Sequence, residues 1–236
     1  MAVAGAAGRM GETVCSAVEG APDMELVGRA DPLLGITVAQ MLEQAGPEVV
    51  IDFTHPDTAL QNALDCLRAG AHVVIGTTGF DIASLTEQAR TCASDASDAS
   101  DEHPAANVFI APNFAIGAVL MMRFAAEACR HMDKAEIVEL HHDRKLDSPS
   151  GTAARTAQLM AEASGGERPP IHSLRLPGIV ANQEVILGDV GQTLTIRHDT
   201  TGRESFMPGV LLAVRRVRTL ESSPVVGLEH LLFEDS

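Results

Sequence analysis

Short apolar segments alternate with helix-like stretches along the first half of the chain, and this alternation constrains the fold more than any other feature. Each segment carries apolar residues at successive positions, which is typical of strands buried on both faces. Glycine, proline, aspartate or asparagine follows most of the segments, and a helical stretch comes next. The strands we expect are Ala2–Ala4, Glu25–Ala30, Val49–Phe53, His72–Ile75 and Val108–Ile110. This order predicts an α/β fold with a doubly wound parallel sheet. We expect Thr54 or Asp57 to cap the helix that follows the third strand.

The pattern changes after residue 114. A long helix to about Met132 and a second helix from Gly151 flank strands that follow one another closely, so we expect a smaller α+β domain here. The strands we expect in it are Glu136–Leu140, Ile171–Leu176, Gln183–Leu187 and Gln192–His198.

The domain boundaries follow from this change of pattern. An apolar helix at Pro208–Val214 is expected to return to the first domain. We therefore place the first domain at 1–114 with 208–236 and the second at 115–207. The polar, acidic near-repeat at 94–102 predicts a mobile surface loop without an assigned function.

The composition argues against several classes of function. A formal net charge of −15 in 236 residues disfavours nucleic-acid binding, which requires a basic face. The apolar run at Gly117–Met122 is far shorter than the roughly 20 residues that span a bilayer. We expect no export signal, because Gly5 interrupts the first apolar residues. The four cysteines lack metal-ligand spacing, so we expect free thiols in a reducing cytoplasm.

A glycine-rich turn joins the first expected strand to the first helix. In Gly5-x-x-Gly8-x-x-Gly11 the missing side chains let the backbone turn tightly and approach a pyrophosphate, whose charge then faces the helix N-terminus. The spacing differs from GxGxxG, so a helix-opening turn without a ligand is the alternative interpretation of this motif alone.

Further features in register with this turn favour a dinucleotide. Asp31 lies 20 residues after Gly11 at the end of the second expected strand, where an acidic residue binds ribose hydroxyls. Gly76–Gly79 and Ala111–Phe114 follow two other strands at their carboxyl ends, where open α/β sheets bind ligands. Together these matches predict a Rossmann-type dinucleotide site.

The choice of cofactor depends on two charged residues of this site. The carboxylate of Asp31 would repel a 2′-phosphate, which favours NADH. Arg9 in the glycine turn could pair with such a phosphate and partly offset the repulsion. We therefore expect NADH as the first cofactor, with NADPH tolerated.

A cluster of ionisable side chains follows the expected strand at Glu136–Leu140. His141 can donate a proton near neutral pH, and Lys145 supplies positive charge or a proton. Gly151 and Thr152 then open a helix whose N-terminus presents backbone N–H groups and a hydroxyl to a carboxylate. Two imidazoles, a lysine and a helix N-terminus predict a pocket for a small anion that is protonated as it reacts.

The residues alone leave other interpretations of this cluster open. Ser150 or Thr152 can act as a helix cap and nothing more. A zinc site at His141, His142 and Asp143 is a weaker hypothesis, because adjacent residues seldom converge on one ion and no cysteine or HExxH helix lies nearby. We therefore expect no metal.

These motifs together resemble the dihydrodipicolinate reductase family, also called 4-hydroxy-tetrahydrodipicolinate reductase, of lysine and diaminopimelate synthesis. The resemblance covers nearly the whole chain and is most specific around 139–153. The motifs that carry it are Val3–Gly11, Ile51–Thr54, Gly76–Phe80, Ala111–Phe114, Glu139–His142, Lys145 and Asp147–Ala153. Segments at 192–199 and 205–216 resemble the actinobacterial branch.

The resemblance implies a cytoplasmic enzyme that reduces a small cyclic imine dicarboxylate by hydride transfer from NADH or NADPH. It implies a proton donor at His141 and its partner at Lys145. The implied substrate contacts are His142, Gly151 and Thr152. The implied cofactor contacts are Gly5, Ala6, Ala7, Gly8, Arg9, Met10, Gly76, Thr77, Thr78, Ala111, Pro112, Asn113 and Phe114. Family members are usually homotetramers built through the sheet of the second domain, which makes 115–207 a substrate-binding and tetramerisation domain.

Two departures from the family and two rival functions complete this interpretation. Arg144 stands where many relatives carry another histidine or a similar residue, and the stretch between Gly166 and Ile171 is shorter than the corresponding loop in related enzymes.

Two rival functions were weighed against the reductase. One rival is a dinucleotide-binding sensor without turnover; the other is a different amino-acid-pathway dehydrogenase, such as an aspartate or homoserine dehydrogenase. The His-His…Lys…Ser-Gly-Thr string argues against both, because neither would be expected to carry it.

Overall fold

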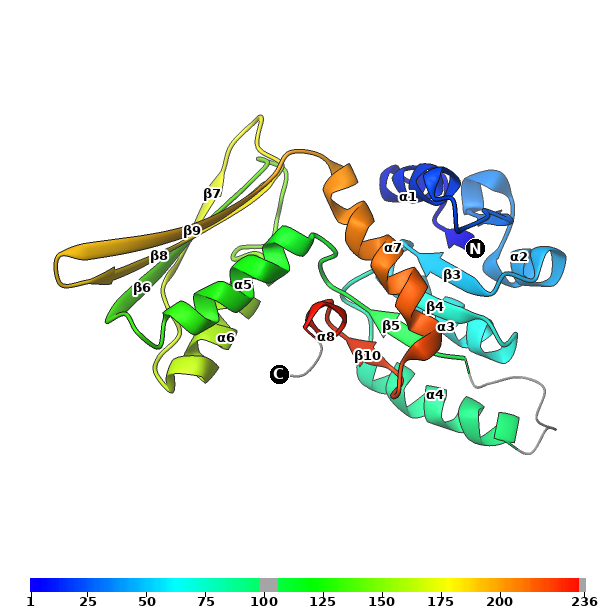
Figure 1. The fold of residues 1–236 in the computed structure, drawn as a ribbon. Coiled ribbons are helices and arrows are strands. Elements are labelled where there is room, and N and C mark those ends of the chain that lie inside the picture. The colour runs from blue at the N-terminus through cyan, green and yellow to red at the C-terminus, as the bar shows by residue number, and fades with distance from the viewer. Residues whose placement is uncertain (98–105, 234–236) are drawn as a thin grey trace. The chain divides into compact units, whose positions relative to one another are not determined.

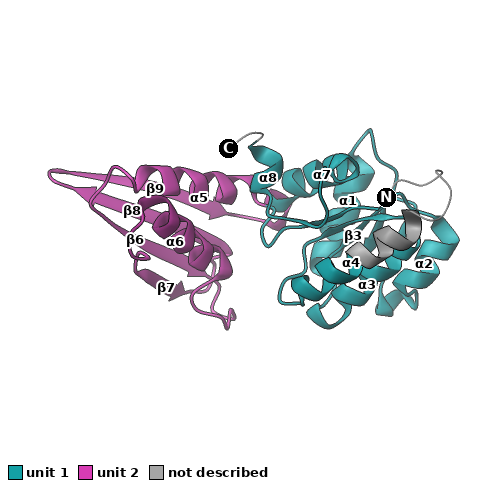
Figure 2. Ribbon diagram, turned by 90° about the horizontal axis from the view of Figure 1, so that it is seen from below, with its two compact units in different colours: residues 1–114, 206–236 teal, residues 115–205 magenta. Residues whose placement is uncertain are grey.

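The computed structural model describes residues 1–97 and 106–233 (Figure 1). The chain divides into two compact units (Figure 2). Unit 1 comprises Met1–Phe114 and Phe206–Ser236, and unit 2 comprises Ala115–Ser205. The predicted return to the first domain at residue 208 lies close to the division at Phe206.

A six-stranded parallel sheet forms the centre of unit 1, with the strand order β10-β5-β4-β3-β1-β2. The strands are β1 (Ala2–Ala4), β2 (Gly28–Ala30), β3 (Val49–Asp52), β4 (His72–Ile75), β5 (Val108–Ile110) and β10 (Val225–Val226). Every residue of β1, β3, β4 and β5 is buried, because helices cover both faces of the sheet. The predicted doubly wound α/β fold is confirmed.

Helices lie in two layers on this sheet. The helices of unit 1 are α1 (Arg9–Gly20), α2 (Val38–Ala45), α3 (Pro56–Arg68), α4 (Ile82–Ser97), α7 (Met207–Arg216) and α8 (Glu229–Leu232), with the 3₁₀ turns η1 (Pro32–Leu34) and η3 (Val217–Thr219). A further 3₁₀ turn, η2 (Arg203–Phe206), precedes α7. Helices α1 and α7 contact each other on one face, and α2, α3 and α4 form the layer on the other (Figure 2). All strands run in the same direction, so their carboxyl ends share one edge of the sheet.

The N-terminus of α3 differs from its prediction, which chose Thr54 or Asp57 as the cap. The N-cap residue is His55, whose Nδ1 accepts a long hydrogen bond of 3.4 Å from the N–H of Asp57. The hydroxyl of Thr54 is used elsewhere, because it donates to the carboxylate of Asp52 at 2.7 Å. The Thr54 hydroxyl therefore binds the buried carboxylate of Asp52 and does not cap the helix.

Two helical segments depart from the sequence prediction. Helix α4 extends to Ser97, so residues 94–97 of the acidic near-repeat are helical instead of forming a loop. The remainder of the predicted loop, 98–102, lies outside the described residues. Helix α2 was missed, although Thr37 and Gln40 form a capping box at its start.

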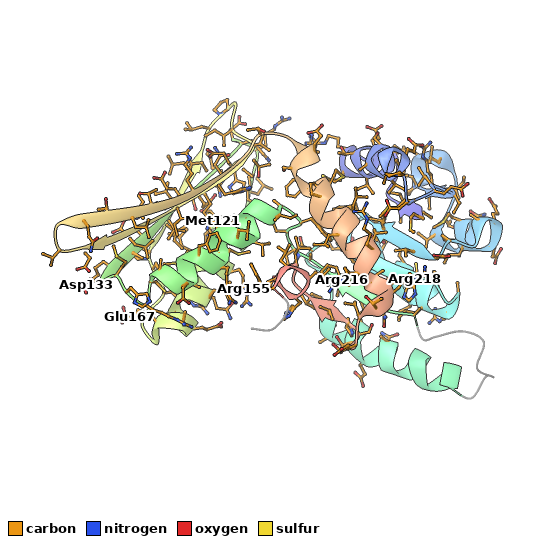
Figure 3. The ribbon with its side chains drawn as sticks, in the orientation of Figure 1. Met121, Asp133, Arg155, Glu167, Arg216 and Arg218 are labelled. Carbon is orange, nitrogen blue, oxygen red and sulfur yellow. The ribbon has the colours of Figure 1, made fainter. Side chains whose placement is uncertain are left out.

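Unit 2 contains a four-stranded mixed sheet with the order β7-β6-β8-β9. Its elements are α5 (Ile116–Ala128), β6 (Lys134–His141), α6 (Gly151–Ser164), β7 (Ile171–Arg175), β8 (Ala181–Asp189) and β9 (Gln192–Thr200). Helices α5 and α6 contact each other and the strands, and Met121 on α5 is buried (Figure 3). This is the smaller α+β domain that the grouped strands predict.

Strand β6 places alternate side chains on the buried face of this sheet. Ile137 and Glu139 are both fully buried, as are Val185 and Leu187 on the neighbouring β8. The same alternation brings His141 to the end of the strand on the face of Glu139. Within the residues that the structure describes, no helix combines the length and apolar character needed to cross a membrane.

Candidate active site

The turn after β1 requires glycine at the positions that the sequence analysis singled out. Gly5 has φ +76°, and a Cβ there would lie 2.5 Å from the carbonyl oxygen of Phe53. A Cβ at Gly11 would overlap the carbonyl oxygen of Gly5. Gly8 is the N-cap of α1 and offers no side chain to cap the first-turn N–H groups. The start of α1 therefore suits an anion such as a pyrophosphate.

Asp31 connects the end of β2 to this turn. One carboxylate oxygen accepts the N–H of Leu33 at 2.8 Å, and the other accepts the N–H of Ala7 at 3.1 Å. Each carboxylate oxygen has two lone-pair sites, so both keep acceptor capacity toward a ribose hydroxyl. Asp31 thus supports the glycine turn in addition to the ribose contact predicted for it.

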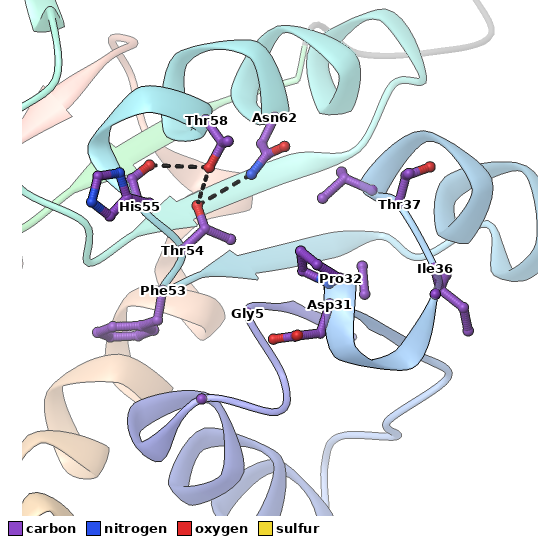
Figure 4. A pocket seen from close by; sticks show the side chains of 14 residues that line it. Gly5, Asp31, Pro32, Ile36, Thr37, Phe53, Thr54, His55, Thr58 and Asn62 are labelled. Atoms are coloured by element: carbon purple, nitrogen blue, oxygen red, sulfur yellow. Dashed lines mark hydrogen bonds between the residues drawn. The ribbon is translucent and has the colours of Figure 1, made fainter.

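A cavity of about 590 Å³ opens beside Asp31 (Figure 4). One wall comes from the segment between β2 and the start of α2, and the other from the segment after β3 and the first turns of α3. Its lining residues are Gly5, Gly8, Ala30, Asp31, Pro32, Gly35, Ile36, Thr37, Val38, Phe53, Thr54, His55, Thr58 and Asn62. This described lining contains no lysine or arginine, and Arg9, the predicted partner of a 2′-phosphate, is exposed and lies outside it.

A buried carboxylate organises the second wall. Asp52 accepts hydrogen bonds from the N–H of Thr54 at 2.9 Å and from its hydroxyl at 2.7 Å. The amide of Asn62 donates to the other oxygen at 2.9 Å, and the hydroxyl of Thr77 donates at 3.1 Å. The network joins the segments that follow β3 and β4 and the first turns of α3.

Three strand ends meet near this network. A Cβ at Gly76 would overlap the ring of Phe53, so the segment after β4 lies directly against that ring. The ring of Phe114 has its centroid 5.9 Å from that of Phe53. The N–H of Ala111 donates to the carbonyl of Ile75 at 3.0 Å. The predicted cofactor segments 76–78 and 111–114 thus lie at the same edge of the sheet, where α/β sheets bind ligands. The glycine turn, the cavity and these strand ends fit a dinucleotide.

His141 ends β6 with its ring held by a carboxylate. Its Nδ1 is hydrogen-bonded to Oε2 of Glu139, and its side chain is about 15% exposed, against 0% for Glu139. A carboxylate acceptor favours the proton on Nδ1. The second ring nitrogen, Nε2, is then the atom that can gain and release a proton.

Arg175 on β7 binds the same carboxylate. Strands β6 and β7 pair His141 with Arg175 in their register. The two terminal nitrogens of Arg175 donate to the two oxygens of Glu139 at 2.8 and 3.0 Å, a fork-to-fork ion pair. The backbone N–H of Ser150 also points at Oε1, at 3.3 Å.

These contacts shift the titration of both groups. Burial lowers the pKa of His141 below its ordinary value, Glu139 acts to raise it, and the cations Lys145 and Arg175 lower it further. Burial would raise the pKa of Glu139, but hydrogen bonds from Arg175, Ser173 and His141 outweigh it and hold that pKa below its usual range. Glu139 is therefore ionised at neutral pH.

Lys145 lies in the loop that follows the strand. Its ammonium group is 2.7 Å from a carboxylate oxygen of Asp147, and its side chain is about 22% exposed. The ammonium lowers the pKa of the Asp147 carboxyl. The N–H of Lys145 donates to the carbonyl of His142 at 3.1 Å, which closes a turn. His142 itself is exposed.

Helix α6 begins directly after this loop. Ser150 is its N-cap, with Oγ accepting from the N–H of Ala153 at 3.2 Å, as one of the open interpretations anticipated. Gly151 and Thr152 occupy the first turn, and a Cβ at Gly151 would have no neighbour within 4 Å. The Thr156 hydroxyl donates to the carbonyl of Thr152 at 2.8 Å. The predicted substrate contacts, His142, Gly151 and Thr152, thus lie between the end of β6 and the first turn of α6.

Metal-ligating residues do not gather in the described part of the chain. No group of three or more histidine, cysteine, aspartate or glutamate side chains is placed there to hold an ion. His141, a member of the weaker zinc hypothesis, has its Nδ1 bonded to Glu139.

Three residues that organise these sites were not predicted from the sequence. Asp52 is an acidic residue at the end of an otherwise apolar strand, and this pattern was the available signal for it. Glu139 shares β6 with Lys134 and Glu136, so its charge alone did not single it out. Arg175 carried no comparable signal, because its contact depends on the pairing of β7 with β6.

Comparison with known proteins assigns both halves of the chain to one family. Residues 1–114 match the family described as "Dihydrodipicolinate reductase, N-terminus", and residues 117–232 match "Dihydrodipicolinate reductase, C-terminus". The 4-hydroxy-tetrahydrodipicolinate reductase of Thermobifida fusca is 47% identical over 252 residues, covering 98% of this chain and 97% of the relative. The enzyme of the same name from Mycobacterium marinum is 46% identical over 253 residues, with the same coverage.

A solved structure shows the same similarity in three dimensions. The dipicolinate-bound dihydrodipicolinate reductase from Paenisporosarcina sp. TG-14 superposes with a TM-score of 0.81. It is 34% identical in sequence, and the match covers 97% of both chains.

Proposed function

Because this chain belongs to the dihydrodipicolinate reductase family, we propose that it reduces 4-hydroxy-tetrahydrodipicolinate to tetrahydrodipicolinate in lysine and diaminopimelate biosynthesis. The protein is an NAD(P)H-dependent oxidoreductase. The observation that carries the proposal within the molecule is the ring of His141 at the end of β6, bonded to the ionised Glu139 and followed by the N-terminus of α6.

The dinucleotide is proposed to bind unit 1. The contacts we propose are Gly5, Ala6, Ala7, Gly8, Arg9, Met10, Asp31, Gly76, Thr77, Thr78, Ala111, Pro112, Asn113 and Phe114. Support comes from the turn in which Gly5 and Gly11 leave no space for a Cβ, and from the cavity beside Asp31. Bound NAD(P)H supplies the hydride of the reaction.

The substrate is proposed to bind unit 2 through its two carboxylates. His142, Gly151 and Thr152 are the groups we assign to them, because a helix N-terminus and an imidazole are natural carboxylate partners. The relative from Paenisporosarcina binds dipicolinate, a ring that carries two carboxylates. The same chemistry is expected here.

His141 and Lys145 handle protons and charge. The hydride adds at C4 of the unsaturated cyclic imine that forms when the substrate loses its 4-hydroxyl as water. Nε2 of His141 then protonates the resulting enamine, so the product gains one hydride and one proton. The ammonium of Lys145 stabilises negative charge that develops near the ring nitrogen.

The test is NADH oxidation with freshly prepared product of the preceding synthase, followed by the loss of NADH absorbance and compared with NADPH. His141→Gln should lower kcat by about 10²–10⁴ with little change in KM, whereas Thr152→Ala should mainly raise KM. His131→Gln is the matched control, since the His131 side chain is about 74% exposed beyond the end of α5. Full kcat in His141→Gln would show that the proton donor is another group, and NADH binding without oxidation would favour a sensor.

We also propose a homotetramer built through the sheet of unit 2. Strand β9 is an edge of that sheet, and Leu194 on it is about 43% exposed, as is Val190, at about 91%, in the preceding hairpin. Burial of such side chains against a second copy is the expected driving force. Sedimentation equilibrium at several protein concentrations tests this. We expect the enzyme to act in the cytoplasm, where its biosynthetic pathway draws on NAD(P)H.

A further inference from the structure

A carboxylate occupies a position in β6 where the fold would take an apolar side chain. Glu139 is two residues after Ile137 on the same buried face, and both are 0% exposed. Burying a charge is costly, and a buried ion pair is often no more stabilising than apolar residues of similar volume. Packing alone therefore does not account for glutamate at this position.

The contacts of Glu139 are arranged around His141. Oε1 accepts from Arg175 at 2.8 Å and from the N–H of Ser150 at 3.3 Å. Oε2 accepts from Arg175 at 3.0 Å and is bonded to Nδ1 of His141. Arg175 is itself fixed, because it donates to the carbonyls of Asp147 and Leu174, each at 2.7 Å. The carboxylate cannot rotate away from the imidazole without breaking this fork.

We propose that Glu139 is a positioning residue that holds the His141 ring with Nδ1 inward and Nε2 as the proton-donating atom, and that Arg175 fixes Glu139 for this task. The proposal rests on His141 being the proton donor of the proposed function. It assigns the roles of two residues that never need to touch substrate: one orients the imidazole, and the other orients the carboxylate.

The charges that face His141 come from three segments. Glu139 lies on its own strand, Arg175 on β7, and Lys145 and Asp147 on the following loop. On the neighbouring β8, Ala181 pairs with His141 and Gln183 pairs with Glu139, and neither residue is charged. The first turn of α6, at 150–152, is uncharged as well. Glu139 is the one group among these that bonds directly to the ring, and it favours the protonated imidazole.

The decisive substitution is Glu139→Gln, which keeps the shape and removes the charge. We expect kcat to fall by at least about tenfold while KM changes little, because the ring loses its fixed orientation. The proton donor must be protonated, so activity is lost as pH rises through the His141 pKa. Without the carboxylate that pKa is lower still, and the alkaline limb of kcat should move down by about one pH unit or more. Activity should therefore recover partly as the pH is lowered.

Matched variants separate this effect from a general change in charge. Glu136→Gln lies on the same strand and removes a similar pair, since Glu136 is 2.8 Å from Nε2 of His172 at the surface. It should leave kcat and the alkaline limb unchanged. Glu139→Asp retains the charge and should keep the limb near its original pH. Circular dichroism and the thermal unfolding of the whole chain show whether each variant is folded.

A spectroscopic measurement on the unaltered enzyme completes the test. The ¹⁵N signals of the His141 ring at alkaline pH should show Nδ1 protonated and Nε2 bare. An Nε2–H tautomer would overturn the proposal even if Glu139→Gln failed to fold. An inactive His141→Gln together with a fully active Glu139→Gln of unchanged pH limb would also overturn it. A fully active His141→Gln would instead remove the proposed proton donor, so the two failures are distinguishable.

Discussion

Replacing Asp52 with alanine removes the acceptor on which one wall of the unit 1 cavity depends. The carboxylate is completely buried and accepts from Thr54, Asn62 and Thr77. The two hydroxyls can turn to other acceptors, but the backbone N–H of Thr54 and the amide of Asn62 have fixed directions.

The magnitude follows from those two donors. A buried donor left without an acceptor costs about 1–3 kcal/mol; both donors are half-buried beside the cavity, so Asp52→Ala should reduce the free energy of unfolding by about 2–4 kcal/mol. Water that enters the new space would bring the loss toward the lower value. For a chain of this size each kcal/mol shifts Tm by about 2–4 °C, which predicts a drop of about 4–16 °C. Asp52→Asn should cost less, because its oxygen can still accept from Thr54.

Thermal unfolding followed by circular dichroism measures this, and NADH titration shows the consequence for binding. Thr54 and Asn62 line the cavity, so Asp52→Ala should also raise the Kd for NADH. Asp57→Ala is the control, since the Asp57 side chain is about 86% exposed and its partner His55 about 74%. If the two alanine variants unfold at the same temperature, the buried network does not stabilise unit 1 and the reasoning fails.

Three further predictions concern other parts of the structure. Gly11→Ala should weaken NADH binding strongly because its Cβ would overlap the preceding turn, whereas Gly20→Ala, with open space around it, should not; equal affinities in a titration would refute this. Asp31→Asn should raise the ratio of kcat/KM for NADPH to that for NADH, because the repulsion of a 2′-phosphate is lost; an unchanged ratio would show that Asp31 does not set the preference. Burial lowers the pKa of His72 below 6.5, so the folded state resists its protonation and stability should fall as pH drops below about 6.5. His72→Gln should show a shallower loss between neutral and mildly acidic pH in urea unfolding, and an identical slope would exclude His72 as the cause.

The parts of the fold that sequence predicts well are those whose signal is local. Strands such as Val49–Asp52 are buried on both faces, so their apolar runs identify them directly. Helix α2 has eight residues, too few for a strong periodic pattern, and its capping box was the sole clear signal. At α3 the expected cap was wrong, because the carboxylate of Asp52, only two residues before Thr54 but buried at the end of β3, binds the Thr54 hydroxyl instead.

The candidate site shows the same division. His141 and Lys145 lie within one short motif, so their proximity is evident from the sequence. The contact between Glu139 and Arg175 joins residues on different strands, and the register that creates it depends on the packing of the whole sheet. Contacts of this kind determine the orientation of the His141 ring, and they cannot be predicted from the pattern of a single sequence.

The interrupted course of unit 1 has a consequence for synthesis of the chain. Strand β10 pairs with β5, and the hydroxyl of Ser223 accepts the N–H of Val108 at 2.8 Å, so this edge of the sheet is covered by residues that are synthesised long after β5. Until then β5 presents an unpaired edge, a known template for aggregation. Nascent chains that stop before residue 220 should therefore expose the edge of β5 to chaperones, and deletion of β10 should lower the yield of native enzyme.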